Sequence, residues 1–501
     1  MSWRRAVIRG FGAGVVAGLL LVSLMYLAKP LIGTTPLPQL LQQPILAVMP
    51  GFVFGFLIDT LQHAGKVVEE AGLIVGMIVG LGVLGGAWGL ARKLWARPPL
   101  ALAFAAAGWV MVAFVLLPIT GDGFLGLNEG PTAPLVWGLL FAAYGVVLQM
   151  GRDPVTVAPV SADPGRRRML QLMPIGIAAL SAGGLVYELL PRWYQAVFKA
   201  PETGLSGASL EITPVDNFYV VSKNFSDPVV SEQGWTLNVG GLVNNLLHLS
   251  LADLRAMPSV TEYVTLECIS NNVGGPLMST GRFTGVRLHD LVSMAVPQSS
   301  ATHVRFKARD GYTESLPLGL ISVAPEILVA YALDDAPLPT SHGFPARVLV
   351  PGHYGMKGPK WLDSIDLASR DDGGYWESEG WDRSALVKTT ARFDVPRDGD
   401  IAKVGSAVRL FGVAFAGKRG ISKVEYSTDG GRNWSAADIG APLSSLTWLL
   451  WNATWTPQQQ GAHMLQVRAV DGTGAAQEPT SSASYPSGAS GYHTIRVDVS
   501  G

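Results

Sequence analysis

The sequence predicts a multi-domain protein with an N-terminal all-α transmembrane bundle, a central α+β domain and a C-terminal immunoglobulin-like β-sandwich. Residues 1–192 are nearly all apolar or glycine, which is typical of membrane-spanning helices. Residues 212–394 mix short strand and helix patterns, whereas residues 395–501 show strand patterns only. Prolines and glycines interrupt any helix in residues 193–211, which are predicted as a linker.

Composition narrows the possible functions. The 501 residues include 37 Lys and Arg against 38 Asp and Glu, a formal net charge of −1. Because no basic patch is interleaved with aromatic residues, nucleic acid is not an expected partner. Cys268 is the single cysteine, which excludes a disulfide within the chain.

Five segments of the N-terminal part are long and apolar enough to cross a bilayer. They are residues 11–28, 71–91, 99–118, 133–150 and 169–190. A sixth candidate, residues 45–61, carries Pro50 and Asp59 and could span, lie in the interface or re-enter. The sequence therefore predicts five or six spans.

Basic residues predict the orientation of these spans. They form three groups: Arg4, Arg5 and Arg9; Arg92, Lys93 and Arg97; and Arg152 with Arg166, Arg167 and Arg168. Five spans place all three groups in the cytoplasm and everything after Leu190 outside it. The stretch Gly165-Arg-Arg-Arg-Met-Leu-Gln171 is also similar to a twin-arginine export signal.

Two cofactor sites are not expected in the N-terminal part. Residues 80–85 match G-x-G-x-x-G by letter, but they lie inside an apolar span with no strand before them. Instead, two sets of glycines are expected to form small faces for close helix contact: Gly76, Gly80, Gly82 and Gly86, and Gly10, Gly14 and Gly18. His63 is the only histidine before residue 193, whereas a membrane b-haem normally needs two.

The elements expected in the soluble part are short. Central strands are expected at residues 235–239, 262–266, 303–307 and 346–350, and helices at 250–256, 288–295 and 318–323. C-terminal strands are expected at residues 407–415, 420–427, 447–455, 463–470 and 493–499. The turns between these strands give the spacing of an immunoglobulin-like sandwich.

The single cysteine lies where a predicted core strand meets a polar loop. Residues 262–266 are rich in β-branched and apolar side chains, and residues 271–275 are mostly asparagine and glycine. A loop on a rigid strand is a common place for a reactive group. A small buried hydrophobe is the equally plausible alternative on these facts alone.

Five motifs resemble, in order, those of the sulfite oxidase family of molybdenum-cofactor enzymes. They are Asp216-Asn-Phe-Tyr219, Thr265-Leu-Glu-Cys268, Asp310-Gly-Tyr312, Ser341-His-Gly-Phe-Pro-Ala-Arg347 and Val350-Pro-Gly-His-Tyr-Gly-Met-Lys-Gly-Pro-Lys-Trp361. Residues 400–499 are similar to the dimerisation domain of that family. The resemblance implies a sulfite-oxidase-type molybdopterin-binding domain and a molybdenum–molybdopterin cofactor.

The resemblance also implies a set of site residues. Deprotonated Cys268 would be the one protein ligand of molybdenum, since the cofactor supplies the other sulfurs. The residues implied to bind the cofactor are Tyr219, Val220, Cys268, Asp310, His342, Arg347, Gly358, Pro359 and Lys360. Arg347 offers a fork of donors for the phosphate of the cofactor. For Asp310, a simple hairpin turn at Asp310-Gly is an equally compatible interpretation.

Departures from the family pattern lie on the substrate side. Residues 220–224 lack the arginine of sulfite-oxidising members, and Lys223 replaces its charge without its fork geometry. Trp381 stands, by spacing, where the family has an active-site tyrosine. A site for a small dianion should be more basic, which argues against sulfite as the substrate. The Asn-Phe-Tyr and Gly-Pro-Lys segments resemble more closely those of exported bacterial relatives that reduce S-oxides.

The sequence as a whole predicts a membrane-anchored molybdopterin-dependent oxidoreductase on the extracytoplasmic side of a bacterial plasma membrane. It would transfer an oxygen atom to or from a small sulfur- or nitrogen-containing substrate, in a sulfite oxidase-like or S-oxide reductase-like reaction. Electrons would pass through a separate carrier, either a cytochrome or a quinone-linked membrane protein, and the C-terminal domain could form a homodimer. The alternatives are a non-enzymatic membrane-tethered binding module, and a transporter or sensor with an appended molybdopterin-fold domain.

Overall fold

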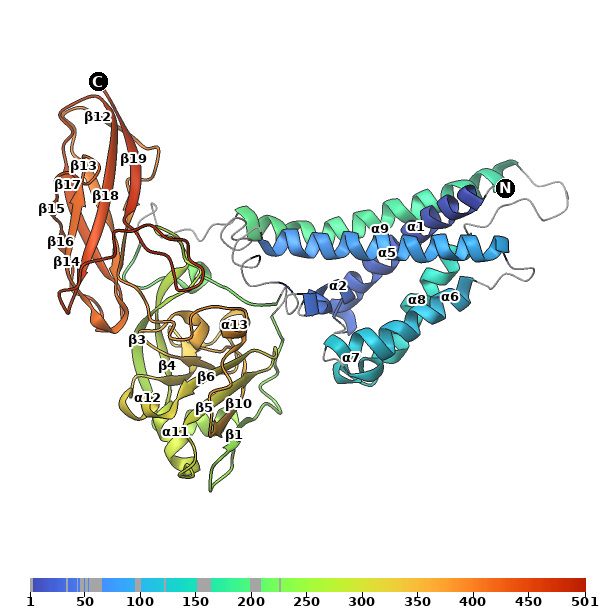
Figure 1. The fold of residues 1–501 in the computed structure, drawn as a ribbon, viewed down its shortest axis with the longest axis horizontal. Helices are drawn as coiled ribbons and strands as arrows, with labels where there is room; N and C mark the ends of the chain where they lie inside the picture. Colours follow the sequence, from blue (N-terminus) through green and yellow to red (C-terminus); the bar gives the residue numbers. More distant parts are fainter. Residues whose placement is uncertain are drawn as a thin grey trace. The chain divides into compact units, whose positions relative to one another are not determined.

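The computed structural model describes residues 3–32, 35–42, 44–45, 49, 53, 65–94, 101–120, 123–150, 164–198, 209–224 and 227–501. The chain forms two compact units, one of residues 1–49 and 61–199 and the other of residues 50–60 and 200–501 (Figure 1). The described part of the first unit is helical, and the second unit contains all of the described strands.

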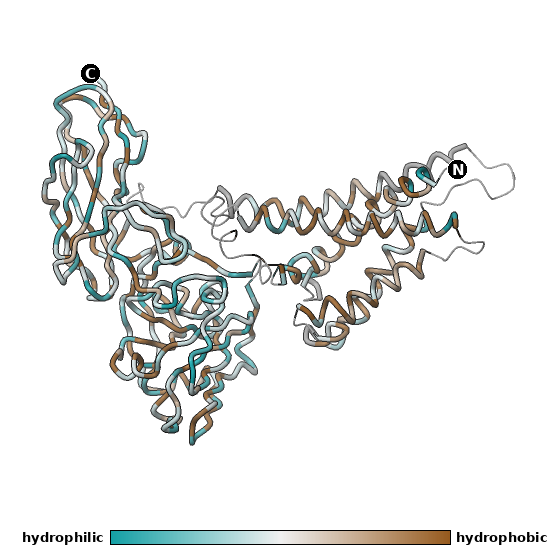
Figure 2. The backbone as a smooth tube through the Cα atoms, viewed as in Figure 1, coloured by the Kyte–Doolittle hydropathy of each residue, from teal (hydrophilic) through white to brown (hydrophobic). Residues whose placement is uncertain are grey.

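The helices of the first unit coincide with the apolar stretches of the sequence (Figure 2). They are α1 (Trp3–Ile32), α2 (Leu37–Leu40), α5 (Gly65–Leu94), α6 (Ala101–Met111), η2 (Val112–Leu116), α7 (Leu117–Thr120), η3 (Phe124–Glu129), α8 (Ala133–Met150) and α9 (Pro164–Phe198). All five segments predicted to span fall almost entirely within these helices.

Three of these helical stretches are long and apolar enough to cross a membrane, judged by length and composition. They are Trp3–Lys29, Val67–Leu94 and Ala101–Thr120. Two shorter apolar stretches are Ala133–Gln149 and Gly176–Pro191. The sixth candidate, residues 45–61, lies mostly outside the described residues, so the number of spans stays a prediction.

Glycines allow α1 and α5 to approach each other closely. A Cβ at Gly10 would clash with the carbonyl oxygen of Gly85, and one at Gly14 would lie 2.6 Å from that of Leu81. The predicted small face is therefore confirmed on α1. A Cβ at Gly80 of α5 would meet no described atom within 4 Å, so this glycine faces away from the contact.

A buried carboxylate joins four helices of the first unit. The Oε1 atom of Glu70 accepts hydrogen bonds from Tyr26 Oη (3.0 Å) and Gln39 Nε2 (2.8 Å). The Oε2 atom accepts one from Trp193 Nε1 at 2.8 Å. Lys29 Nζ donates to Gln39 Oε1 at 2.9 Å. The side-chain amide of Gln39 therefore connects the ammonium of Lys29 to the carboxylate of Glu70.

The contact with Trp193 corrects one predicted boundary. Helix α9 continues to Phe198, so residues 193–198 are helical and do not belong to the predicted linker 193–211. The helix continues because Trp193 packs against the apolar side chains of α1 and α5 and donates to Glu70. Residues 199–208 lie outside the described residues.

Glu70→Ala is expected to destabilise the helical unit. Two buried donors, Tyr26 and Gln39, and the partly buried Trp193 would lose this acceptor, and each unsatisfied buried group costs about 1–3 kcal/mol. Thermal unfolding of the detergent-solubilised chain, followed through helix content, should show a clearly lower midpoint. Glu188→Ala is the matched control, since Glu188 is half-buried on α9. Equal midpoints for the two variants would contradict the role given to Glu70.

The central domain of the second unit contains two sheets. The first has the order β2 (Leu247–Leu249), β1 (Leu237–Gly241), β10 (Leu362–Ala368), β5 (His303–Ala308), β6 (Thr313–Pro317). The second has the order β3 (Val260–Glu267), β4 (Met278–Arg287), β7 (Leu328–Leu333), β8 (Ala336–Pro337), with β9 (Arg347–Leu349) beside β7. Its helices are α10 (Leu251–Ala256), α11 (Leu288–Ala295), α12 (Leu318–Val323) and α13 (Tyr375–Ser378), and its short turns are η6 (Val215–Asn217), η7 (Thr340–His342) and η8 (Gly355–Lys357).

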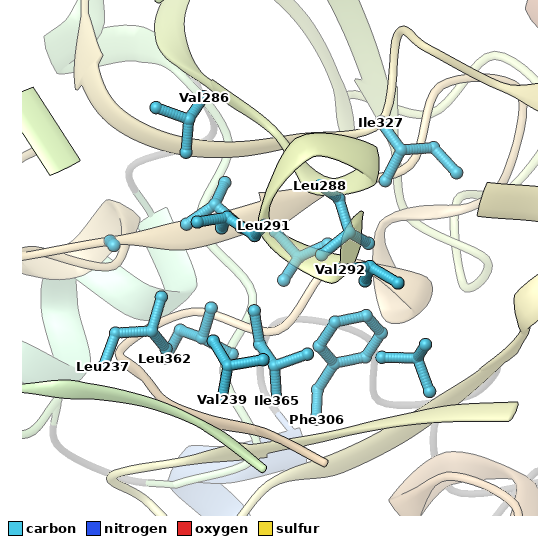
Figure 3. Close-up of a cluster of buried hydrophobic side chains, with 14 of the residues drawn as sticks. Leu237, Val239, Val286, Leu288, Leu291, Val292, Phe306, Ile327, Leu362 and Ile365 are labelled. Carbon is cyan, nitrogen blue, oxygen red and sulfur yellow. The ribbon is translucent and has the colours of Figure 1, made fainter. Parts of the chain in front are cut away.

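Helix α11 shows why these residues fold as predicted. Leu288, Leu291 and Val292 lie three and four residues apart, so they share one helix face. Figure 3 shows this face beside strand residues that include Leu237 and Ile365, and all of them are buried. This cluster is the main core of the domain, and it confirms the predicted mixture of short helices and strands.

The C-terminal domain also consists of two sheets, and it begins with β11 at Thr390, before the predicted boundary at residue 395, because β11 pairs with β13. One has the order β11 (Thr390–Val395), β13 (Val408–Phe415), β17 (Leu449–Trp455), β16 (Asp438–Ile439). The other has the order β12 (Ile401–Lys403), β19 (His493–Ser500), β18 (Gly461–Asp471), β14 (Ile421–Ser427), β15 (Ser435–Ala436). Its core includes Trp451, which is fully buried.

The C-terminal domain covers the free edge of β3. The backbone amide of Thr265 donates to Leu446 O at 3.0 Å, and its hydroxyl accepts from Trp448 N at 2.8 Å. Ser444 Oγ donates to Tyr263 O at 2.7 Å. These bonds protect an edge strand that would otherwise expose unpaired backbone groups, and they fix the strand that leads to Cys268.

Candidate active site

Cys268 directly follows β3 and begins a loop that returns to β4. Its amide donates to Leu277 O at 3.0 Å, and its Sγ lies 3.1 Å from Ser270 Oγ. The residue as a whole is half-buried, and its sulfur lies beside the polar hydroxyl of Ser270. Burial raises the pKa of the Cys268 thiol above its usual value, partly offset by its hydrogen bonds to Ser270.

Tyr219 connects the cysteine to a second group of predicted residues. Burial and the nearby Cys268 raise the pKa of the Tyr219 phenol, whereas the neighbouring Arg347 lowers it. The phenol oxygen lies against η8, since a Cβ at Gly355 would be 2.7 Å away from it. The adjacent predicted residue, Val220, is exposed.

Arg347 and His342 are buried side by side. Arg347 is 6% exposed, its Nη1 donates to His342 O at 3.3 Å, and its Nε has no hydrogen-bond partner among the described residues. Burial lowers the pKa of Arg347 to about 10. Burial and the charges of Arg347 and Lys360 lower the pKa of His342 to about 3, so its imidazole is neutral at pH 7.

Lys360 belongs to the same group of basic residues. Its Nζ donates to Ser341 O at 2.8 Å and lies 4.3 Å from the centre of the Trp361 ring. The structure therefore brings together His342, Arg347 and Lys360, as the sequence predicts.

Three further predicted residues have local contacts that need no ligand. Asp310 lies in the hairpin between β5 and β6, where its Oδ1 accepts from Tyr312 N at 2.9 Å. Gly358 packs against its own domain, because a Cβ there would lie 2.6 Å from Val348 O. Pro359 O accepts from Val348 N at 2.9 Å, so these two residues shape the backbone beside β9.

Lys223 lies at the substrate side identified from the sequence. It is 5% exposed, its Nζ donates to Asn224 Oδ1 at 2.9 Å, and it lies 5.2 Å from the centre of the Tyr375 ring. Burial lowers the pKa of Lys223, opposed by the nearby carboxylate of Asp310. Trp381 is also buried, with its ring 5.2 Å from that of Tyr485.

Sequence reasoning missed a buried charged cluster beside this site. Lys357 Nζ lies 2.9 Å from Glu314 Oε1 and also contacts Glu377 Oε1. All three side chains are at most 4% exposed. The residues come from β6, η8 and α13, so the sequence contains no local pattern that would have revealed the cluster.

Comparisons with known proteins agree with this geometry. Residues 224–376 match the oxidoreductase molybdopterin binding domain, and residues 384–499 match the Mo-co oxidoreductase dimerisation domain. The mitochondrial sulfite oxidase of Homo sapiens is 31% identical over 280 residues, which are 46% of this chain and 51% of that protein. The sulfite oxidase of Arabidopsis thaliana is 29% identical over 275 residues, or 45% of this chain and 70% of that protein.

A solved structure supports the same fold. The sulfane dehydrogenase SoxCD from Paracoccus pantotrophus has a TM-score of 0.50 and 20% identity, covering 60% of this chain and 86% of that chain. The chain spans about half the length of the mammalian relatives it matches. Its second unit is that of a molybdopterin-dependent oxidoreductase. More specifically, it carries the molybdopterin-binding and dimerisation domains of the sulfite oxidase family.

The residues present fit a molybdenum–molybdopterin cofactor. Arg347 provides a buried guanidinium nitrogen that still lacks an acceptor in the described part of the chain, as expected for a group that binds an anionic ligand. Lys360 adds a second positive charge, and the half-buried Cys268 adds a thiol. A thiol, a guanidinium and an ammonium are suitable groups for a metal and a phosphate.

Proposed function

We propose that this chain is a membrane-anchored molybdenum oxidoreductase that transfers an oxygen atom to or from a small sulfur- or nitrogen-containing substrate. The observation that carries the proposal is the position of Tyr219. Its phenol oxygen lies against Gly355, which also faces the carbonyl of Glu267 next to Cys268, and the charges of both Cys268 and Arg347 affect the pKa of this phenol. The thiol and the buried donors therefore belong to one site. When bound, the cofactor supplies the two-electron chemistry that oxygen-atom transfer requires.

The proposed roles of the residues follow from their chemistry. Cys268 ligates molybdenum through its thiolate. Arg347, His342 and Lys360 donate to the pterin and its phosphate, with His342 acting as a neutral donor. The remaining proposed contacts are with Tyr219, Val220, Asp310, Gly358 and Pro359.

Arg347→Lys is expected to weaken cofactor retention by about tenfold or more. Lysine keeps the charge but cannot reproduce the guanidinium fork, and a charged hydrogen bond contributes about 1.5–3 kcal/mol. Pterin and molybdenum contents should be measured after gel filtration. Arg305→Lys is the matched control, because Arg305 pairs with Asp372 at the surface. Equal retention in both variants would exclude Arg347 from the cofactor site.

Lys223 indicates how substrate choice should be tested. It provides one buried ammonium beside an aromatic ring, which is a less basic setting than a dianion would favour. The names of the relatives point to sulfite oxidation, whereas the single ammonium favours reduction of a neutral S-oxide. Sulfite should be assayed with an oxidising dye, and methionine sulfoxide and small N-oxides with a reducing dye. Protein that contains molybdenum but turns over none of these substrates would reject the proposal.

The surroundings of the enzyme are part of the proposal. The apolar helices would anchor it in a bacterial plasma membrane through five or six spans, with residues 212–501 on the extracytoplasmic side. A cytochrome or a quinone-linked membrane protein would carry the electrons. The two sheets of the C-terminal domain, which begins at Thr390, would form an immunoglobulin-like sandwich that pairs two chains. A C-terminal reporter active only outside the cytoplasm tests the orientation.

A further inference from the structure

The loop that begins at Cys268 is closed by its own hydrogen bonds. Asn271 N donates to Cys268 O at 3.0 Å, while the Asn271 side chain accepts from Leu277 N at 2.9 Å. The same side chain donates to Glu267 Oε1 at 3.0 Å. Residues 268–277 therefore form a compact loop, called here the cysteine loop, whose ends are fixed to each other.

The C-terminal domain reaches the cysteine loop through Arg392 of β11. Arg392 is 5% exposed, and its Nη1 donates to Gly275 O at 2.6 Å. Its Nε donates to Asp394 Oδ1 at 2.9 Å, which fixes the direction of the guanidinium. This buried, charge-assisted hydrogen bond therefore links the C-terminal domain to the cysteine loop of the central domain.

His493 of β19 contacts the same loop at the neighbouring residue. Gly274 has a φ of +75°, and a Cβ there would clash with the His493 ring, so only glycine fits. The Nδ1 of His493 accepts a hydrogen bond from Phe393 N at 2.9 Å. Burial and Arg392 lower the pKa of His493 to about 4, so a neutral ring packs on the loop at pH 7.

Arg392 also forms a hydrogen bond with Ser209, in the segment that precedes the central domain. Its Nη2 donates to Ser209 Oγ at 3.0 Å, and Asp394 Oδ2 accepts from Ser209 N at 3.0 Å. Ser209 is 6% exposed. One guanidinium therefore contacts the cysteine loop, its own strand and the chain that follows residue 208.

We infer that Arg392, supported by His493, positions the cysteine loop, so that the C-terminal domain shapes the metal site of its own chain. This function is separate from pairing two chains. It rests on the proposed function only in treating Cys268 as the metal ligand. Arg392 is a positioning residue, because it touches the loop through Gly275 and does not contact the thiol.

The test measures local motion in the full-length chain, purified in detergent from cells that cannot make the cofactor. Hydrogen exchange of peptides covering residues 268–277 is compared between the wild type and Arg392→Gln. Loss of one charged hydrogen bond should speed exchange in this loop by about tenfold, while peptides from α11 stay unchanged. Alkylation of Cys268 by iodoacetamide should accelerate in parallel.

Three further variants separate positioning from general stability. Arg496→Gln removes an exposed ion pair with Asp498 on β19 and should leave the loop unchanged. Ser209→Ala removes the hydrogen bond from Arg392 Nη2 to Ser209 Oγ but keeps the bond from Arg392 to Gly275, so loop exchange should again match the wild type. Arg392→Lys retains one donor and should restore part of the protection.

The outcomes decide the inference without reference to turnover. Faster exchange confined to the cysteine loop in Arg392→Gln, with partial rescue by lysine, supports it. Unchanged loop exchange, or an equal acceleration across the whole unit, overturns it. If Arg392→Gln does not fold, Arg392→Lys is compared with the wild type by the same criteria. Because these measurements need no metal, failure of the enzymatic proposal would be seen separately, as absence of molybdenum from the wild-type protein.

Discussion

Cys268→Ser is expected to abolish turnover and to remove most of the molybdenum from the purified protein. The thiolate is the one proposed protein ligand of the metal, and serine is a harder and far less acidic donor. Changes next to a metal ligand cost about 10–100-fold in affinity or activity, so loss of the ligand itself should cost at least that much. Metal analysis and dye-linked assays measure the two effects.

The control for this experiment is Ser270→Ala. Ser270 lies 3.1 Å from the sulfur in the same loop, so its substitution reports on disturbance of the loop without removing the ligand. Because Ser270 lies next to the ligand, Ser270→Ala should weaken metal retention by at most about 10–100-fold and keep clearly more molybdenum than Cys268→Ser. A wild-type protein without molybdenum, or equal molybdenum in wild type and Cys268→Ser, would refute the metal-site assignment. Both variants should show wild-type circular dichroism before any conclusion is drawn.

The sequence predicted elements well where local pattern determines structure. Helices α11 and α12 cover residues 288–295 and 318–323, as predicted, because their apolar residues recur at helical spacing. Strand β4 was not predicted, since its buried positions include Ser279 and Thr280, which lack an apolar signature. The hydroxyl of Thr280 lies 2.5 Å from that of Thr265 on β3, a pairing that only the folded sheet creates.

The same contrast between local sequence pattern and tertiary packing holds for the candidate site. The group of His342, Arg347 and Lys360 was predictable because its members lie in two motifs close in sequence. The contact between Arg392 and Gly275 joins residues 117 positions apart and was not predictable from local pattern. Motifs identify the residues that touch a ligand, whereas the residues that hold them are determined by tertiary packing.

The charged cluster of Glu314, Lys357 and Glu377 leads to the second large prediction. Lys357→Met is expected to destabilise the central domain by about 3–5 kcal/mol, because it leaves the buried carboxylate of Glu314 without its cation and Glu377 with only the exposed Arg383. Urea unfolding of the detergent-solubilised chain should show this loss. Lys418→Met is the matched control, since Lys418 is exposed in its pair with the partly buried Glu326, and its loss should cost about 1 kcal/mol, clearly less than that of Lys357.

Protonation of the same cluster gives this prediction a pH dependence. Burial raises the pKa of Glu314 from its ordinary value to about 7, opposed by Lys357. Between about pH 4.5 and 7 the unfolded chain loses this proton before the folded protein does, so stability should fall as pH rises through this range. The rise in the pKa of Glu314 corresponds to a loss of about 3 kcal/mol in the free energy of unfolding across this pH range. Above about pH 7 both states are ionised and Glu314 adds no further slope.

Glu314→Gln separates this contribution from the other titrating groups. Glutamine cannot ionise, and its oxygen can still accept from Lys357 and from Ser315 N, as Glu314 Oε1 does. The stability of the wild type relative to Glu314→Gln should therefore be greater at pH 5 than at pH 8. In Lys357→Met, adding Glu314→Gln should recover part of the lost stability, because only one buried carboxylate remains. A constant difference between wild type and Glu314→Gln from pH 5 to 8 would mean that Glu314 is ionised throughout in the folded protein, with Lys357 sufficient to hold both carboxylates charged.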